Sequence, residues 1–442
     1  MTLSTSQAVL HQRTGPWTCR GRSLRVGVLL LLLGVSTLFG LQEGDAVGAD
    51  WPQFRGPDGQ GIASTEPVPT VWSETRNVVW RTPLNGTGHA SPVIWKNQIW
   101  LATASNDGKS LGAVAIDRTT GKTLHTVVVF QPTDVEEIHS TNSYASPTPV
   151  IAEGRLYLDF GTYGAACVDT ETAEILWKNT DLKIEHQGGP GSSPRLFRDT
   201  LILQRDGADA QYVVALNVDT GKVVWKRPRS APFRENRITH RAFATPLLIE
   251  HDGVPLLISP AADQTHAYNA ATGEEIWHVR YTGFSNVPCP IVCGEYVILC
   301  TGFFQPRIIA VRQGGRGDVT ETHIAWSYAA QVPDTPSPIA VDGQIYMVSN
   351  KGILTSLNGE TGERIFIKRL GGNYSSSPIF AGGHLYICSE EGVTHVLKPG
   401  EKADIVETNK LKGRIMASPI ALEGAIYLRT DLALYRIETP PK

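Results

Sequence analysis

Charged residues, aromatic residues and long apolar runs are all limited in this sequence. Charged side chains make up 19% of the 442 residues, and the formal net charge is −3. No basic patch stands out along the chain, so we expect no nucleic-acid partner. Beyond the N-terminal region no stretch is apolar enough to span a bilayer, so we expect no membrane span in the mature chain.

Cysteine is scarce and irregularly spaced. Of the 6 Cys, Cys19 lies near the N-terminus and the others are Cys167, Cys289, Cys293, Cys300 and Cys388. An odd number at these spacings fits neither a disulfide framework nor a zinc site. We interpret most of them as small buried core residues, with one oxidised pair among Cys289, Cys293 and Cys300 as the alternative. The sequence also has no Gly-x-Ser-x-Gly elbow, phosphate loop or His-Glu-x-x-His motif.

The N-terminal region has the pattern of a secretory signal peptide. Four arginines, of which Arg25 is the last, precede an apolar run over residues 26–39, and Val47-Gly48-Ala49 offers small residues for cleavage. The run is shorter than the ~20 residues that a transmembrane helix needs. We therefore predict a signal peptide over residues 1–49, and a periplasmic or secreted mature chain that begins at Asp50 with a net charge of about −5.

Glycine and proline are abundant, and proline marks a repeat. The 43 Gly and 28 Pro are typical of many short strands joined by turns. A small or hydroxyl residue followed by Pro opens an apolar run in each repeat, with a spacing of roughly 40 to 55 residues that suits one four-stranded propeller blade. The repeats begin at Ser91-Pro92, Ser146-Pro147, Ser193-Pro194, Thr245-Pro246, Cys289-Pro290, Ser337-Pro338, Ser377-Pro378 and Ser418-Pro419.

A second motif recurs in the later part of the repeats. Its frame is a small residue, then Asp or Asn, Gly and Trp, as in Ala215, Asn217, Gly221 and Trp225. The Asn side chain can cap the turn, Gly supplies a positive φ, and Trp lands on an outer strand where it can wedge between blades. The tryptophans to which we assign this blade-docking role are Trp80, Trp177, Trp225, Trp277 and Trp326.

The repeats predict an all-β fold, an eight-bladed propeller of four-stranded antiparallel blades. The final repeat, residues 416–437, has room for only three strands, and Val78-Val79-Trp80 resembles the fourth strand of other repeats. We therefore predict that a strand at about residues 77–84 completes the last blade and closes the ring. Residues 50–76 form an extension that packs on the propeller, and residues 77–440 form the single propeller domain.

This frame, repeated over nearly all of the mature chain, resembles the tryptophan-docking repeat of the pyrroloquinoline-quinone-type propeller family. The resemblance is to an exported, non-catalytic branch similar to the lipoprotein propeller of the outer-membrane barrel assembly machinery. Other members are quinoprotein dehydrogenases, which stack the quinone between a Trp and a disulfide of two adjacent Cys and bind Ca²⁺. This chain has no Cys-Cys dipeptide, so we expect no cofactor, neither pyrroloquinoline quinone nor Ca²⁺.

The segments that lead into the innermost strands of a propeller converge at one mouth of its central channel, where functional loops are common. Polar and aromatic residues in these segments form a ligand pocket in one interpretation, and ordinary solvent-facing loops in the other. We expect neither a catalytic residue nor a metal ligand among them. The candidate binding residues are His89, His139, Asn142, Tyr144, His186, Asp206, Asp209, His240, Arg241, Asn286, Asp334, Asn373, Tyr374 and Arg414.

The complete blade frame, without a complete catalytic set, favours an exported non-enzymatic propeller. Its loop face would bind an envelope or extracellular protein, or a saccharide. The alternative is an enzyme, either a relic of a quinoprotein dehydrogenase or a metal-dependent or carbohydrate-active enzyme that uses the His-rich mouth. An assembly scaffold would be indicated by an exposed apolar or aromatic surface on the loop face.

Overall fold

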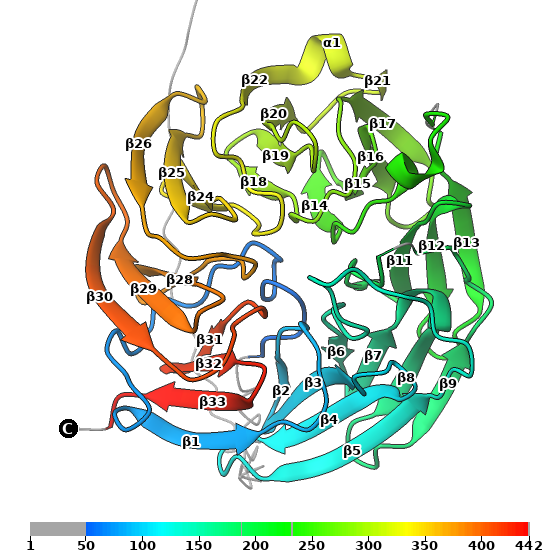
Figure 1. Cartoon of the computed structure of the whole chain (residues 1–442). Coiled ribbons are helices and arrows are strands. Elements are labelled where there is room, and N and C mark those ends of the chain that lie inside the picture. The colour runs from blue at the N-terminus through cyan, green and yellow to red at the C-terminus, as the bar shows by residue number, and fades with distance from the viewer. Residues whose placement is uncertain (1–49, 187, 231–232, 441–442) are drawn as a thin grey trace, which may run out of the picture. The chain divides into compact units, whose positions relative to one another are not determined.

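The computed structural model describes residues 50–186, 188–230 and 233–440, so the predicted signal peptide lies outside the described residues. The described chain forms eight antiparallel sheets arranged around a ring (Figure 1). Within it, helical structure is limited to three short segments, and the prediction of an all-β, eight-bladed propeller is confirmed. These segments are η1 (Gly161–Tyr163), η2 (Arg237–His240) and α1 (Thr320–His323).

The first four blades follow one another along the chain, each with its innermost strand first. Blade 1 consists of β2 (Val93–Trp95), β3 (Gln98–Ala104), β4 (Leu111–Asp117) and β5 (Thr123–Phe130). Blade 2 consists of β6 (Val150–Ala152), β7 (Arg155–Asp159), β8 (Ala165–Asp169) and β9 (Ile175–Asn179). Blade 3 consists of β10 (Arg195–Phe197), β11 (Thr200–Asp206), β12 (Gln211–Asn217) and β13 (Val223–Pro228). Blade 4 consists of β14 (Leu247–His251), β15 (Val254–Ala261), β16 (Gln264–Asn269) and β17 (Glu275–Arg280), with β21 (Gly317–Asp318) added in parallel to β17.

The remaining blades complete the ring. Blade 5 consists of β18 (Ile291–Cys293), β19 (Tyr296–Cys300), β20 (Ile308–Arg312) and β22 (Ile324–Tyr328). Blade 6 consists of β23 (Ile339–Val341), β24 (Gln344–Val348), β25 (Ile353–Asn358) and β26 (Arg364–Arg369). Blade 7 consists of β27 (Ile379–Ala381), β28 (His384–Cys388), β29 (Val393–Lys398) and β30 (Asp404–Lys410). Blade 8 consists of β31 (Ile420–Leu422), β32 (Ala425–Arg429), β33 (Ala433–Glu438) and, as its outermost strand, β1 (Val78–Pro83).

The ring closes through the strand that the sequence predicted. β1 pairs antiparallel with β33, from Val78 opposite Ile437 to Pro83 opposite Ala433. N-terminal and C-terminal segments therefore share one blade, and the ring has no blade with a missing outer strand (Figure 1). Closure of this kind ties the two ends of the propeller together and protects edges that an open arrangement would expose.

The hydroxyl residue before each innermost strand joins its blade to the neighbouring one. In seven of these junctions the backbone N–H of one blade donates to the side-chain hydroxyl at the equivalent position of the next blade, at 2.9 to 3.1 Å. We call these positions the hydroxyl belt. Its donor and acceptor pairs are Ser91 to Thr148, Thr148 to Ser193, Ser193 to Thr245, Cys289 to Ser337, Ser337 to Ser377, Ser377 to Ser418, and Ser418 back to Ser91.

The belt corrects one repeat boundary. The belt residue of blade 2 is Thr148, which precedes Pro149, so the prediction of Ser146-Pro147 was wrong by two residues. Ser146 instead contacts the side chains of Asn142 and Ser143 within its own loop. Both prolines follow a hydroxyl residue, and only the pairing between blades distinguishes the two.

The outer-strand tryptophans pack against the next blade. Trp177 donates its indole N–H to the carbonyl oxygen of Val218 at 2.7 Å, and its ring covers Gly221, where a Cβ would lie 2.5 Å from the nearest ring carbon. Gly121, Gly273 and Gly362 meet Trp80, Trp225 and Trp326 in the same way. Trp277 donates to the carbonyl oxygen of Gln313 in blade 5. The glycine of the motif therefore supplies both a positive φ and the space for the neighbouring indole.

The first part of the N-terminal extension, residues 50–63, lies against the innermost strands inside the ring, where Figure 1 shows it in blue. Trp51 forms a bridge with Ile94 of blade 1, and the carbonyl oxygen of Pro52 accepts the N–H of Ile151 in blade 2. Further along, Ile62 forms a bridge with Phe380 of blade 7. These contacts occupy backbone groups on the inner edges of the blades, which would otherwise face the channel.

Two buried arginines fasten this extension. Arg55 is 2% exposed and donates to the carbonyl oxygens of Gly59, Gln60, Pro338 and Pro378, thereby contacting blades 6 and 7. Arg195 of blade 3 donates to the carbonyl oxygens of Phe54 and Pro246 and to the Cys289 sulfur. Burial lowers the pKa of Arg55 to about 10, so the side chain stays charged at neutral pH.

Replacing Arg55 by Ala should destabilise the ring, because several buried carbonyl oxygens would each lose a charged donor. We expect the free energy of unfolding to fall by about 3 kcal/mol. Thermal melting of the purified protein measures the change. Arg76→Ala, at an exposed position on the same extension, should melt like the unchanged protein, and equal melting of both variants would contradict the fastening role.

Two glycine variants can separate the contribution of the indole-over-glycine contact to stability from the energetic cost of a positive φ. Gly221 (φ +66°) lies under Trp177, whereas no atom lies within 4 Å of a Cβ built on Gly253 (φ +74°). Gly253→Ala should cost about 1 kcal/mol of stability, the backbone penalty alone. Gly221→Ala should cost about 2 kcal/mol more, because the methyl group displaces the indole. Equal losses in chemical denaturation would show that the contact is dispensable.

Candidate functional site

The predicted site residues lie at one end of the ring. Because the strands of a blade are antiparallel, the loop before the first strand and the loop between the second and third strands emerge at the same end. We call this end the loop face. The opposite end, which we call the hairpin face, carries the turns between first and second strands. The structure places all the predicted channel-mouth residues on loops or strand ends of the loop face.

In the loop before blade 2, the predicted residues hold the loop itself. Asn142 donates to the carbonyl oxygens of Gly188 and Pro190, which links this loop to the one before blade 3. The Tyr144 hydroxyl donates to the carbonyl oxygen of Glu136 at 3.0 Å. His139 is exposed, with its Nδ1 2.8 Å from the Thr141 hydroxyl.

The other three predicted histidines are either buried or in contact with backbone groups of the protein itself. His186 is buried, and its Nε2 accepts the backbone N–H of Thr162 at 2.9 Å; burial lowers its pKa to about 3. His89 is half-buried, and burial together with the charge of Arg429 lowers its pKa to about 4. His240 places its Nε2 2.6 Å from the carbonyl oxygen of Arg234. The imidazoles therefore do not converge on one ligand.

The two predicted aspartates have different surroundings. Asp206 is buried and forms two 2.6 Å hydrogen bonds with Arg229. Burial raises its pKa and the guanidinium opposes that rise. Asp209 is exposed, and its Oδ1 accepts the backbone N–H of Glu185 at 2.7 Å. Sequence reasoning missed the arginine partner of Asp206, since two strands, β12 and β13, lie between the two residues in the chain.

A second buried ion pair escaped the sequence analysis. Asp159 and Arg205 form hydrogen bonds of 2.6 and 2.9 Å between blades 2 and 3, and both side chains are almost fully buried. Nothing in the repeat frame marks either residue. Their positions at the ends of β7 and β11 are equivalent to apolar or small residues in several other blades.

The loops before blades 4 and 5 are joined by hydrogen bonds. Arg241 donates from Nε to the Ser285 hydroxyl at 3.1 Å. Asn286 is fully buried, and its side-chain amide donates to the Tyr281 hydroxyl and the carbonyl oxygen of Cys300. These two predicted residues consequently hold the two loops in place.

The predicted residues of blades 6 to 8 divide between buried and exposed positions. Asp334 is half-buried, and desolvation raises the pKa of its carboxyl. Tyr374 is fully buried, and burial also raises its pKa. Asn373 and Arg414 are exposed, and they contact Glu391 and Glu390 respectively. The predicted set therefore forms several separate loop networks rather than one pocket.

The cavity beneath the loops of blades 2 to 4 is too small for a ligand. Its lining includes Asp159, His186, Gln204, Arg205 and Phe243, and its volume is about 10 Å³. That space is at the lower limit for a single water molecule. Within the part of the chain that the structure describes, no group of three or more His, Cys, Asp or Glu side chains could hold a metal ion.

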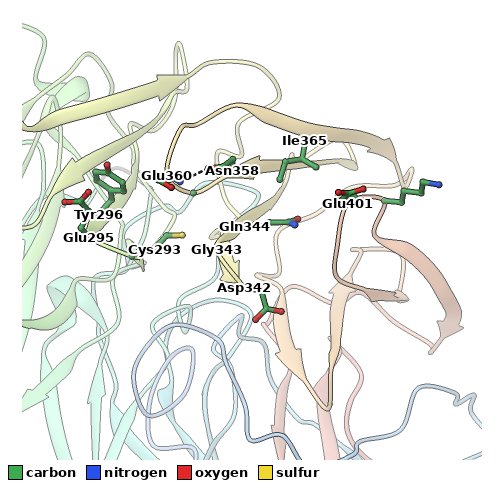
Figure 2. Close-up of a pocket in the computed structure, with 13 residues that line it drawn as sticks. Cys293, Glu295, Tyr296, Asp342, Gly343, Gln344, Asn358, Glu360, Ile365 and Glu401 are labelled. Atoms are coloured by element: carbon green, nitrogen blue, oxygen red, sulfur yellow. Dashed lines mark hydrogen bonds between the residues drawn. The ribbon is translucent and has the colours of Figure 1, made fainter.

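A larger cleft lies on the hairpin face, where the sequence analysis predicted no site. It has a volume of about 840 Å³ and is lined by turns of blades 5, 6 and 7. Figure 2 shows Glu295 and Tyr296 on one side, Glu401 on the other, and Asp342 below. Glycine and acidic residues are ordinary in turns, so nothing in the residue pattern of these turns indicates a cleft.

The described residues do not fit a quinone of the dehydrogenase type. Cys167, Cys289, Cys293, Cys300 and Cys388 are all buried and unpaired, so they do not provide a disulfide of adjacent cysteines. The predicted docking tryptophans lie on outermost strands rather than at the channel. Among the residues described, no helix has the length and apolar character required to cross a membrane.

Comparison with known families decides the wider relationship. Residues 135–258 and 252–439 match the family described as outer membrane protein assembly factor BamB. The chain belongs to this BamB family. The resemblance drawn from the docking motif is thereby confirmed, and the match extends from the loop before blade 2 to the end of blade 8.

Solved structures show the same fold in BamB and in dehydrogenases. BamB from Moraxella catarrhalis is 14% identical, with 81% of this chain and 99% of that chain covered and a TM-score of 0.57. A europium-containing methanol dehydrogenase is 10% identical, covers 88% and 91% respectively, and has a TM-score of 0.65. The quinohemoprotein alcohol dehydrogenase from Comamonas testosteroni is 11% identical, covers 89% and 81%, and has a TM-score of 0.60. No curated protein matches the sequence.

His186 should make stability depend on pH. Its pKa is about 3 in the folded protein and about 6.5 in the unfolded chain, so only the unfolded chain takes up a proton between these values. Stability from this group is therefore lost as the pH falls below about 6.5, by about 2 kcal/mol at about pH 5. His186→Gln keeps an acceptor for the Thr162 N–H, and its melting temperature should fall less steeply on acidification. Parallel pH profiles of variant and unchanged protein would exclude this contribution.

Proposed function

We propose that this chain is an exported, non-enzymatic propeller that binds another protein of the cell envelope through its loop face. The sequence supports export through residues 1–49, and the family described as an outer membrane protein assembly factor supports a protein partner. The dehydrogenases among the solved structures share the fold, which by itself implies no activity.

One observation carries this proposal. The polar side chains of the loop face are largely used to hold its loops together, while several large apolar side chains on the same loops are exposed to solvent. Ile238, Phe303, Phe304 and Leu432 are each at least 48% exposed. A fixed surface that displays apolar side chains is suited to a protein partner, because their burial drives association.

The interior of the ring supports the same function. Residues 50–63 line the inner edges of the blades. The buried side chain of Arg55 extends from this segment to blade 6, and the buried side chain of Arg195 extends from blade 3 to this segment. We propose that no quinone binds, and that the channel serves to hold the ring together. Binding then takes place on the outer surface of the loops.

Site-specific photo-crosslinking in the native envelope tests the proposed face. A photoreactive residue at Asn373 or Leu432 on the loop face should give a discrete covalent adduct with an envelope protein. The same residue at Glu360 or Lys402 on the hairpin face should give none, because these positions lie at the opposite end of the ring. Adducts from the hairpin face alone would overturn the proposed surface.

Enzymatic alternatives have their own tests. The proposal fails if the purified protein takes up pyrroloquinoline quinone with Ca²⁺ and reduces a dye when alcohols or sugars are added. Metal analysis of protein purified without chelator addresses the metal-dependent alternative. We expect no stoichiometric transition metal in that sample.

A further inference from the structure

Three phenylalanines lie on neighbouring loops of blade 5. Phe284 belongs to the loop before blade 5, and Phe303 and Phe304 belong to the loop between β19 and β20. We call them the phenylalanine patch. Phe303 and Phe304 are 54% and 64% exposed, more than any other large hydrophobic side chain of the described residues.

Backbone hydrogen bonds connect the loops that carry the patch. The N–H of Phe303 donates to the carbonyl oxygen of Phe284 at 2.8 Å, and the N–H of Phe243 donates to that of Asn286 at 2.7 Å. The rings of Phe284 and Phe303 meet edge to face, with centroids 5.9 Å apart. At the base of the Phe303 loop, the Thr301 N–H donates to the carbonyl oxygen of Arg307, and the Arg307 N–H donates to the Thr301 hydroxyl. The patch is therefore held in position before any partner arrives, which lowers the entropic cost of binding.

Phe304 is held in a strained conformation at the tip of this loop. Its φ is +88°, a region that bulky side chains rarely adopt, and its side chain points largely into water. Strain of this kind costs on the order of 1–3 kcal/mol and is concentrated at functional positions. A phenylalanine at this position gains nothing from burial in the fold, and its backbone conformation is unfavourable. Contact with a partner explains its presence.

The excess of arginine around the patch favours a negatively charged partner. The two loops that carry it, together with the hydrogen-bonded loop before blade 4, contain Arg234, Arg237, Arg241 and Arg307, and between residues 234 and 246 the acidic residue is Glu235. Arg234 and Arg237 contact Asp263 and Glu185, and Arg307 is exposed beside the phenylalanine tip. Aromatic side chains together with arginine are typical of the residues that contribute most to protein interfaces. The local charge is opposite to the net negative charge of the whole chain.

We propose that the phenylalanine patch binds a polypeptide segment of the partner in which apolar anchor residues stand beside carboxylates. The apolar residues cover Phe303 and Phe304, and the carboxylates face Arg307 and Arg241. This inference rests on the proposed function and specifies which part of the loop face performs it. It assigns the binding energy to apolar burial and the orientation of the segment to charge.

Selection of peptides against the purified full chain tests the partner chemistry. A displayed library of random dodecapeptides serves as the probe, and the enriched peptides are synthesised and measured by fluorescence anisotropy. We expect enrichment of aromatic or aliphatic residues next to Asp or Glu, and affinities that weaken as salt is added. Failure to enrich any peptide, or enrichment of basic peptides, would overturn the proposal.

Phe304→Gly provides the sharpest variant. Glycine adopts a φ of +88° without strain, so the variant should be at least as stable as the unchanged protein, while its affinity for the selected peptides falls about tenfold or more. Val224→Ala, at a similarly exposed apolar position on the outermost strand of blade 3 and outside the loop face, is the matched control and should bind normally. Arg307→Glu should weaken binding, whereas Arg316→Glu on the hairpin face should not. Undiminished binding by Phe304→Gly would remove the patch from the interaction.

Crosslinking separates the failure of this inference from failure of the proposed function. A photoreactive residue in place of Phe304 should capture the envelope partner, and prior addition of a selected peptide should prevent the capture. If Asn373 or Leu432 positions give the adduct and the Phe304 position does not, the loop face binds the partner elsewhere and the patch proposal is wrong. If no loop-face position gives an adduct, the proposed function itself fails.

Discussion

The hydrogen bond from one blade to the hydroxyl of the next is the interaction on which the rest of the ring depends. It lies just before the innermost strands, and seven such bonds between the eight blades lie around the channel. The donor is a backbone N–H with no partner within its own blade at that point, so the side chain of the neighbour satisfies a buried group. Blade 5 places Cys289 at this position, and its sulfur accepts from Arg195.

The N-terminal extension and the docking tryptophans provide further contacts between the blades, in addition to the hydroxyl belt. At the outer edge four of the docking indoles cover a glycine of the next blade, and inside the ring residues 50–63 contact blades 1 to 7. Arg55 and Arg195 are buried among carbonyl oxygens, where a guanidinium can satisfy several acceptors at once. A ring stabilised at its inner and outer edges can carry loops that vary without loss of the fold.

This division of labour explains where function lies. Residues such as Asn142, His186 and Asp206 hold the loops, and their polar groups already have partners. The side chains left for an external partner are then mainly apolar, and Phe303 and Phe304 are the most exposed of these. Polar loops on a β-propeller are thus compatible with a binding surface whose energy comes from burial of apolar groups.

The sequence by itself determined the number of blades, their strand order and the closure of the ring by residues near 77–84. These features follow from local patterns, namely alternation, turn residues and a repeated hydroxyl-Pro pair, and local patterns are visible in one dimension. The docking glycine and tryptophan are readable for the same reason, since each residue keeps a fixed place in its blade.

Only the tertiary structure decided which polar residues are free. The sequence suggested Asp206 as a pocket ligand, whereas the structure places Arg229, from the segment after β13, beside it. Thr148 is distinguished from Ser146 only by its partners in the neighbouring blades. The sequence does not indicate that Arg55 lies inside the ring, because two of its acceptors, the carbonyl oxygens of Pro338 and Pro378, are 283 and 323 residues away in the chain. Burial and pairing depend on contacts distant in the sequence, and the same holds for the phenylalanine patch, whose members come from two separate loops.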